Sequence, residues 1–470
     1  MSILSADGIT FDVEVPVVII GAGAAGLVAA LSAREAGQEV LVLERDAVPR
    51  GSTALSAGLI PAPGTRWQEV AGIVDSPEQF GRDIVAKASG EPEPGLVRMV
   101  TEAVGPAVEW LADRHGLPFS LIEDFRYPGH SVCRMHGLPS RSGGELIDRL
   151  REAAAQAGVD ILCDAHVTDL FAEADGRIAG VAVERPDGSQ ELIGCGALIL
   201  ACNGYGGNKD LVQRHIPELG TALYFGHEGN QGDALLWGQA LEAAARHLSG
   251  HQGHGSVAYP HGILITWATI TEGGFQVDLR GERFSDESHG YSEQAAVVLR
   301  QPKGLAWTVF DTRIAGIARQ FEDFRQAESL GAILTAETIE DLARQMGVPA
   351  DALLSTVQEV DALKHSGAAD RFGRSFAGSP PLKAPYCAVK VTGALFHTQG
   401  GLVVDRDARV MREDGTSLPN LYAVGGAACG VSGSRAEGYL SGNGLLSAVA
   451  LGRIAGLASG QAAARGMATP

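Results

Sequence analysis

The chain has 470 residues, of which 45% are apolar and 20% charged, and these proportions exclude an intrinsically disordered protein. It carries 37 Lys and Arg against 56 Asp and Glu, a formal net charge of −19, which argues against nucleic acid or an anionic membrane face as a partner. At about 150 residues per domain, the length predicts two or three domains. The 62 glycines are not periodic, which favours nucleotide-binding loops over collagen.

The cysteines indicate neither a metal site nor a disulfide framework. They are Cys133, Cys163, Cys195, Cys202, Cys387 and Cys429. None has the CxxC or Cys/His spacing of iron–sulfur, haem or zinc sites, so we expect no metal and reduced thiols in the cytoplasm. No signal-peptide pattern opens the chain. The uncharged stretch 16–33 is long enough for a membrane span, but its glycines favour a buried strand, turn and helix, so no integral membrane segment is expected.

The N-terminal region carries a dinucleotide-binding pattern. A β-branched run at 16–20 predicts a buried parallel strand, and Gly-Ala-Gly-Ala-Ala-Gly follows at 21–26. A helix is expected at 27–36 and a second strand at 39–43, which ends at Glu44. The glycines let the backbone approach a pyrophosphate, and the helix N-terminus offers N–H groups to that anion. We expect the Glu44 carboxylate to accept hydrogen bonds from ribose hydroxyls and to repel a 2′-phosphate.

Other elements follow in chain order. Ser142 and Glu145 have the spacing of a capping box before a helix. The remaining predictions are strands at 159–162 and 198–201, hairpins at Asp175-Gly176 and Asp187-Gly188, a helix at 338–345, a polar loop at 364–381 and a strand before Gly425. The region 222–384 differs in character and holds most of the histidines.

Several segments resemble the FAD-binding family that contains the fumarate reductase, succinate dehydrogenase and aspartate oxidase flavoproteins and the 3-ketosteroid dehydrogenases. The resembling segments are the N-terminal fingerprint, the loop 50–61, and residues 201–208, 229–233, 281–287, 397–401, 418–426 and 442–444. The resemblance implies an α/β fold: a Rossmann-like FAD-binding domain (parallel sheet with β-ribbon) in two parts, at 1–221 and 385–470. It implies an inserted α+β capping domain at 222–384.

The same resemblance implies FAD as the cofactor. The residues it assigns to FAD are Gly21, Gly23, Ala25, Gly26, Glu44, Arg45, Ser52, Thr53, Ser56, Ala57, Gly58, Val167, Ala201, Gly204, His397, Gly425, Gly442, Asn443, Leu445 and Leu446. His397 either lies at the flavin edge or is structural. Covalent members of the family carry a histidine just before the threonine of the Ser/Thr loop. Here Ser52 precedes Thr53, so we expect non-covalent FAD.

Two positions distinguish branches of the family. Carboxylate-reducing members carry arginines over the flavin, and the matching positions here hold Tyr291 and Tyr439. This looks like the ketosteroid dehydrogenases, and Tyr439 with Ser441 resembles the 4,5-desaturating branch. The resemblance implies Tyr291 as the base that removes an α-proton. Tyr439, assisted by Ser441 and the Gly442–Asn443 turn, would then stabilise negative charge on the ketone oxygen.

The expected reaction is desaturation of a cyclic ketone, with hydride transfer to the flavin. The substrate is a 3-oxosteroid, or a small ring ketone such as 4-oxocyclohexanecarboxylate if Arg435 binds an acid. Arg435 alternatively pairs with Glu437. Tyr127 lies with His130 and His136 in a loop that approaches substrate in ketosteroid dehydrogenases, and Asn443 is the third expected substrate contact.

Alternative functions remain open. A fumarate-reductase-like ene-reductase is one, and a non-catalytic flavin module is another. The electron acceptor is unassigned among oxygen, a quinone and a carrier protein. The spacing of His251, His254 and His261 fits no metal pattern, so we expect them in a solvated loop.

Overall fold

The computed structural model describes residues 2–467, with side chains described to residue 462. The chain forms two compact units. The first comprises Met1–His215, Gly226–His251 and His397–Pro470, and the second Ile216–Phe225 and Gln252–Phe396. The division into folding domains at 1–221, 222–384 and 385–470 stays a prediction.

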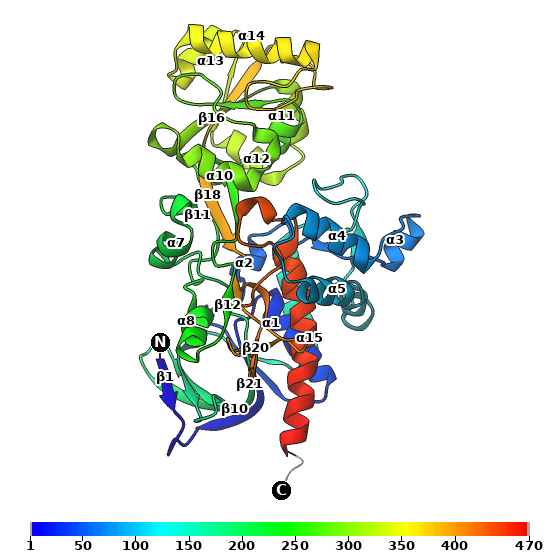
Figure 1. The fold of residues 1–470 in the computed structure, drawn as a ribbon, viewed down its shortest axis with the longest axis vertical. Helices are drawn as coiled ribbons and strands as arrows, with labels where there is room; N and C mark the ends of the chain where they lie inside the picture. The colour runs from blue at the N-terminus through cyan, green and yellow to red at the C-terminus, as the bar shows by residue number, and fades with distance from the viewer. Residues whose placement is uncertain (1, 468–470) are drawn as a thin grey trace. The chain divides into compact units, whose positions relative to one another are not determined.

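The first unit contains a nine-stranded sheet with helices packed against it (Figure 1). The strands of the first unit as a whole are β1 (Ser2–Ser5), β2 (Val13–Ile20), β3 (Val40–Leu43), β4 (Ile60–Pro61), β5 (Ser120–Leu121), β6 (Met135–Gly137), β7 (Asp160–Leu162), β8 (His166–Ala172), β9 (Ile178–Glu184), β10 (Gln190–Leu200), β12 (Ala245–Arg246), β19 (Gly401–Leu402), β20 (Arg409–Met411) and β21 (Ser417–Ala423). Its helices are α1 (Ala24–Glu35), α2 (Gly51–Ala54), α3 (Arg66–Val70), α4 (Pro77–Lys87), α5 (Pro94–His115), α6 (Gly143–Gln156), α7 (Lys209–His215), α8 (Asp233–Ala240) and α15 (Asn443–Met467).

The parallel part of this sheet is built by strands far apart in the sequence. β2 pairs in parallel with β3 and β10, β3 pairs with β7, and the end of β10 pairs with β21. The β2 residues 17–20 and the β3 residues Val42 and Leu43 are buried, as expected for strands covered on both faces. This confirms a Rossmann-like parallel sheet, with both predicted strands in place.

A β-ribbon extends the sheet. β8, β9 and β10 form an antiparallel meander, and the connections between them are at the two predicted Asp-Gly turns. Gly176 and Gly188 have φ of +87° and +81°, a conformation that glycine adopts without steric cost. The hairpins predicted at these positions are confirmed.

Only one of the two hydrogen bonds of the predicted capping box forms before α6. The Ser142 side chain accepts the N–H of Glu145, as predicted. The Glu145 carboxylate, however, accepts the N–H of Ser140 at 2.7 Å rather than that of the N-cap residue. The helix start is therefore as expected, while the reciprocal bond lies two residues earlier.

Helix α15 packs directly along α1 (Figure 1). Three glycines at four-residue spacing, Gly452, Gly456 and Gly460, lie on the α15 face that meets α1. A Cβ at Gly456 would be 2.2 Å from the Ala29 carbonyl oxygen, and one at Gly452 would be 2.7 Å from that of Ala25. Side chains at these positions would hold the helices apart, so the glycines permit the close approach.

Of the described helices, only α15 is long and apolar enough to cross a membrane. Its stretch Asn443–Ala462 has a mean hydropathy of 1.2, and 61% of it is buried inside the protein.

The second unit is a separate mixed sheet with its own core. Its strands are β11 (Leu223–Tyr224), β13 (His251–Ala258), β14 (Ile263–Leu264), β15 (Phe275–Val277), β16 (Leu305–Asp311), β17 (Ile333–Ala336) and β18 (Tyr386–Thr398). Its helices are α9 (Ala268–Thr271), α10 (Tyr291–Leu299), α11 (Thr312–Ala318), α12 (Glu322–Ser329), α13 (Ile339–Met346) and α14 (Ala350–Ser366). Thr338 caps α13 by accepting the N–H of Asp341, which confirms the helix predicted at 338–345. The predicted loop begins later than expected, because α14 continues to Ser366.

Candidate active site

In the glycine turn after β2, the backbone passes very close to the end of β10. Gly21 has φ of +106°, and a Cβ there would be 2.6 Å from the carbonyl oxygen of Ala201 at the end of β10. A Cβ at Gly26 would be 1.9 Å from the Gly21 carbonyl oxygen. The turn therefore needs glycine at both positions, and it brings Gly21, Gly26 and Ala201 together.

Two side chains fix the start of α1. The buried Glu44 accepts the N–H of Ala22 at 2.8 Å, and Thr53 accepts that of Ala24 at 3.0 Å. The N–H groups of Ala25 and Gly26 find no acceptor among the described residues. These two donors, at the positive end of the helix, are what a pyrophosphate requires.

A hollow of about 520 Å³ lies beside the Glu44 end of β3. Arg45, Asp46 and Leu55 line one part of it and residues 226–229 another. Arg45 forms an ion pair with Asp233 at 2.5 Å. Burial raises the pKa of this aspartate. Polar groups beside an exposed leucine suit a nucleoside, and Arg45 is where the sequence predicted a cofactor contact.

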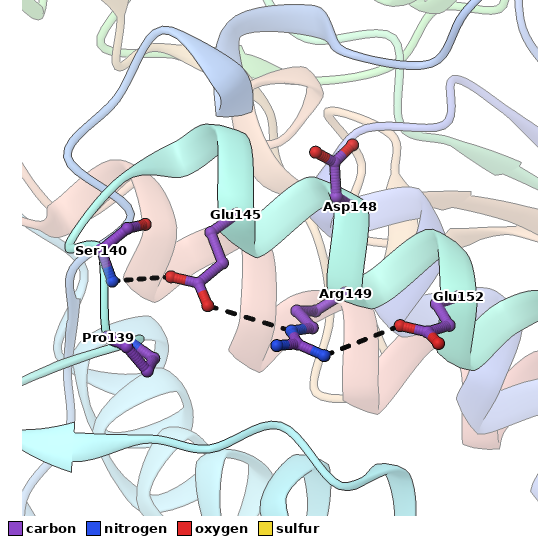
Figure 2. Close-up of a pocket in the computed structure, with 6 residues that line it drawn as sticks. All are labelled: Pro139, Ser140, Glu145, Asp148, Arg149 and Glu152. Carbon is purple, nitrogen blue, oxygen red and sulfur yellow. Dashed lines mark hydrogen bonds and ion pairs between the residues drawn. The ribbon is translucent and has the colours of Figure 1, made fainter.

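A second hollow, of about 510 Å³, is drawn in Figure 2. It lies along α6, and Glu145, Asp148, Arg149 and Glu152 line it. Figure 2 shows Arg149 bridging Glu145 and Glu152, at 3.9 and 3.8 Å. The hollow holds none of the predicted site residues. Its Asp148 pairs instead with Arg50 and Arg151.

The Ser/Thr loop lies against the glycine turn through Thr53. Ser52 accepts the side-chain N–H of Asn230 at 2.8 Å, and Ser56 donates to the Thr53 carbonyl. Gly58 has φ of +64°, and a Cβ there would be 2.5 Å from the Ser142 carbonyl oxygen.

The other predicted cofactor residues are placed as follows: Gly23 is the N-cap of α1, Ala57 follows α2, Val167 is buried on β8, Gly204 packs on Thr398, Gly425 lies against Ala25, and Leu445 and Leu446 belong to the first turn of α15.

The turn that opens α15 gathers a second group of predicted residues. Gly442 has φ of +90°, and a Cβ there would be 2.7 Å from Pro61 Cδ. The N–H of Asn443 donates to the Leu440 carbonyl. Asn443 is therefore not free to help stabilise a ketone oxygen with its backbone. The N–H of Gly442 finds no acceptor among the described residues, so it is the turn's donor for a ligand.

A directional hydrogen-bond chain runs behind this turn. Asn443 Nδ2 donates to Ser432 Oγ at 2.9 Å, and Ser432 donates to Gln399 Oε1 at 2.6 Å. Gln399 Nε2 then donates to Nδ1 of His397 at 3.0 Å. The chain leaves Asn443 Oδ1 buried without a partner among the described residues. A buried acceptor without a donor is costly, and an imide N–H such as that of a flavin would satisfy it.

His397 lies against Tyr439. The ring centroids are 5.3 Å apart, with an edge-to-face angle of 75°. Burial lowers the pKa of His397 to about 4, so the ring is neutral near pH 7. Because its Nδ1 accepts from Gln399, the proton is on Nε2. The structure thus brings His397, Tyr439 and Asn443 together.

Arg435 and Tyr127, both expected substrate contacts, lie in different environments: Arg435 is exposed and ion-paired, and Tyr127 packs on a buried cluster. Arg435 pairs through Nε with Glu91 at 3.1 Å and not with Glu437, so that interpretation was wrong. The arginine side chain is 56% exposed. Tyr127 packs against a small buried cluster that includes Met135, and burial raises its pKa.

Within the second unit, Tyr291 is the first residue of α10, after Gly290 at φ of +150°. His254 stacks on Tyr291 at 5.0 Å and on Phe396 at 5.4 Å, and Phe396 stacks on Phe225 at 4.8 Å. The prediction of a solvated histidine loop was wrong for His251 and His254. Both are buried on β13, while His261 is exposed.

Burial and one hydrogen bond determine the protonation state of His254. Its Nδ1 accepts the N–H of Ser256 at 3.1 Å, and burial lowers its pKa to about 3. The ring is therefore neutral, with its proton on Nε2. No local sequence pattern predicts this column of four rings, because its members come from four separate segments.

A buried ionic network anchors the segment before Tyr291. Glu287 receives hydrogen bonds from Arg283 at 2.7 Å and from Arg374 at 2.8 Å. All three side chains are buried, so the charges stabilise each other instead of being solvated. Among the described residues, no group of three or more His, Cys, Asp or Glu is arranged to hold a metal.

Comparison with known proteins identifies the family to which this chain belongs. Residues 16–445 match the family model described as FAD binding domain. A probable fumarate reductase of Shewanella frigidimarina is 30% identical over 94% of this chain and 74% of its own length. A solved flavocytochrome c3 fumarate reductase in an open conformation is 29% identical, with a TM-score of 0.84 over 96% of this chain and 79% of that one. The 3-ketosteroid-Δ4-(5α)-dehydrogenase of Rhodococcus jostii RHA1 is 25% identical, with a TM-score of 0.76 over 97% and 99%.

Proposed function

The chain belongs to the FAD-binding family that contains the fumarate reductases, and from that premise we propose that it desaturates a cyclic ketone. Membership makes it an FAD-dependent oxidoreductase of that family. The observation that carries the finer proposal is the pair of phenols, Tyr291 and Tyr439. They stand at the positions where the resemblance expects arginines in carboxylate-reducing members.

The residues described above fit FAD. The free N–H groups at the start of α1 suit its pyrophosphate, Glu44 and Arg45 its ribose end, and the unpartnered Asn443 Oδ1 a donor on its ring. When bound, FAD supplies an acceptor for the hydride that leaves the β-carbon of the ketone.

The chain's own residues supply acid–base chemistry. In the proposed roles, Tyr439 donates its hydroxyl hydrogen to the ketone oxygen, with the Gly442 N–H as a second donor and Ser441 assisting. Donors placed where negative charge develops stabilise an enolate. Tyr291, after losing its hydroxyl proton to solvent, takes the α-proton as a phenolate.

Two substrate classes are supported by different observations. The Rhodococcus enzyme was solved in complex with 4-androstene-3,17-dione, which supports a 3-oxosteroid. The exposed Arg435 supports a small ring ketone that carries a carboxylate. A fumarate-type ene-reductase is the second candidate function, and the fumarate reductases among the relatives favour it.

Anaerobic flavin titration separates these functions. We expect a cyclic ketone to bleach the yellow holoprotein, and fumarate to leave the dithionite-reduced protein colourless. Reoxidation by fumarate without bleaching by any ketone would establish the ene-reductase instead. A response to neither class would leave a flavin-binding module.

The tyrosines are tested one at a time. Tyr291→Phe and Tyr439→Phe should keep FAD and lower kcat about 10²–10⁴-fold, the usual contribution of a proton-transfer or charge-stabilising group. Tyr259→Phe and Tyr422→Phe are the matched controls in the second and first unit and should retain normal rates. A tyrosine whose loss leaves turnover unchanged has no part in the reaction.

A further inference from the structure

The contacts of the two ring nitrogens of His130 determine which of them carries the proton. The ring is buried, with its Nδ1 3.3 Å from Nη1 of Arg134 and its Nε2 3.0 Å from the Ser441 carbonyl oxygen. A guanidinium can only donate hydrogen bonds. Nδ1 must therefore accept, the ring proton must be on Nε2, and Nε2 donates to Ser441.

Arg134 is held so that it cannot turn away. Its side chain is fully buried and forms two bonds to Asp75, Nε to Oδ2 at 2.9 Å and Nη2 to Oδ1 at 3.0 Å. Nη1 also donates to Asp83 at 2.5 Å. Phe80 packs against both partners, with the guanidinium carbon 4.5 Å and the His130 ring 5.8 Å from its centroid. The charged and titratable groups facing this imidazole are thus Arg134, Asp75 and Asp83.

The bond from His130 ends at the turn that opens α15. The Ser441 carbonyl lies just before Gly442, and buried carbonyls need a donor. The loop carrying His130 packs closely on this turn: a Cβ at Gly129, where φ is +86°, would be 2.6 Å from Leu440 Cδ1. A histidine 311 residues away in sequence thereby fixes the peptide between Ser441 and Gly442.

We propose that His130 is a positioning residue, which orients the Gly442 N–H and the first turn of α15 by donating Nε2–H to Ser441. Arg134, clamped by Asp75 and Asp83, sets the tautomer that makes this donation possible. The inference rests on the proposed function to the extent that it takes residues 439–443 as the flavin and ketone turn.

Two substitutions at this position separate donation from packing. His130→Gln retains an N–H near the place of Nε2, whereas His130→Phe keeps a ring against Phe80 and removes the donor. His215→Phe is the control, because the buried Nε2 of His215 has no partner among the described residues. We expect His130→Phe to raise the FAD dissociation constant tenfold or more and to shift the flavin absorbance spectrum. His130→Gln should stay within threefold of the parent.

The measurements keep this proposal distinct from the ketone reaction. FAD affinity and the flavin spectrum need no substrate, so they decide the role of His130 even if no ketone bleaches the protein. Parental affinity and spectrum in His130→Phe, or equal impairment in His130→Gln, would overturn the proposal.

Histidine NMR reads the tautomer of His130 in the parent holoprotein, and the His130→Gln variant serves only to assign its resonances. In the ¹⁵N-histidine-labelled holoprotein, the resonances absent from His130→Gln belong to His130. We expect the Nε2–H tautomer from pH 6 to 8. An Nδ1–H tautomer or an imidazolium in that range would refute the assignment.

Discussion

At the scale of single residues, the proposed ketone desaturation depends on two phenols at positions where arginines are expected. A guanidinium keeps its charge at all accessible pH values and binds carboxylates bidentately. A phenol is neutral near pH 7, donates one hydrogen bond, and takes up a proton again once it has lost one. Tyr291 and Tyr439 therefore suit a substrate that is polarised at a carbonyl and loses a proton beside it.

The attachment of FAD is a residue-scale prediction. No histidine precedes Thr53; Ser52 stands there and accepts a hydrogen bond from Asn230. A serine hydroxyl offers no ring nitrogen for a covalent bond to the flavin. Precipitation of the holoprotein with acid should therefore release yellow cofactor into the supernatant. Colour that stays with the washed pellet would show a covalent link.

Arg435 discriminates between the two proposed substrate classes. Glu91 binds its Nε, and hydrogen bonds from Ser434 hold the pKa of Glu91 below its usual range, so this carboxylate is ionised. If the guanidinium also binds a substrate carboxylate, Arg435→Ala should raise KM about tenfold or more for a carboxylated ketone. It should not change KM for a neutral steroid.

The matched control is Arg246→Ala, another half-exposed arginine paired with a glutamate. Steady-state kinetics with both ketones provides the comparison. An equal change in KM for the two ketones, or the same effect from Arg246→Ala, would exclude Arg435 from substrate recognition.

At the scale of elements, the sequence was most informative where one local pattern carried the whole signal. The strand–turn–helix from β2 to α1, the two Asp-Gly hairpins and the capped α13 were predicted within a few residues. Each depends on periodicity and on turn or cap residues that are adjacent in the chain.

The errors came from contacts between distant segments. His251, His254 and His261 were predicted in a solvated loop because their spacing fits no metal pattern. The segment around His254 is a buried strand because Tyr291 and Phe396 stack on it. Arg435 likewise forms its ion pair with Glu91, which is 344 residues earlier in the chain, and not with its neighbour Glu437.

The packing of α15 on α1 gives an element-scale prediction. Gly456→Ala would place a methyl group 2.2 Å from the Ala29 carbonyl oxygen, and such overpacking costs about 1–3 kcal/mol or more. Gly316→Ala, in α11, meets nothing within 4 Å and should be neutral or stabilise by about 0.5–1 kcal/mol. Urea unfolding of the two holoproteins measures the difference. Equal midpoints would show that the close helix approach is not needed.

At the scale of the whole molecule, buried histidines predict sensitivity to acid. Burial lowers the pKa of His130, His136 and His397 to about 4 and that of His254 to about 3. In the unfolded chain these rings protonate near pH 6.5. The unfolded state therefore binds more protons below that pH, and stability falls as the pH drops from about 6.5 toward 4.

Unfolding free energies measured between pH 8 and pH 4.5 test this coupling. The dependence should be shallow above pH 7 and should steepen below pH 6.5, as unfolding takes up protons on these histidines. A flat curve between pH 7 and pH 5 would mean that these histidines are not buried as neutral rings.

The most direct test of the ketone reaction is the mass of the product. The holoprotein is mixed under anaerobic conditions with one equivalent of a 3-oxosteroid or a 4-oxocyclohexanecarboxylate, and the organic fraction is analysed after the flavin has bleached. The account predicts a ketone lighter by two hydrogens, with a new α,β double bond, in an amount equal to the flavin reduced. An unchanged ketone, together with reduction of fumarate by the dithionite-treated protein, would contradict it.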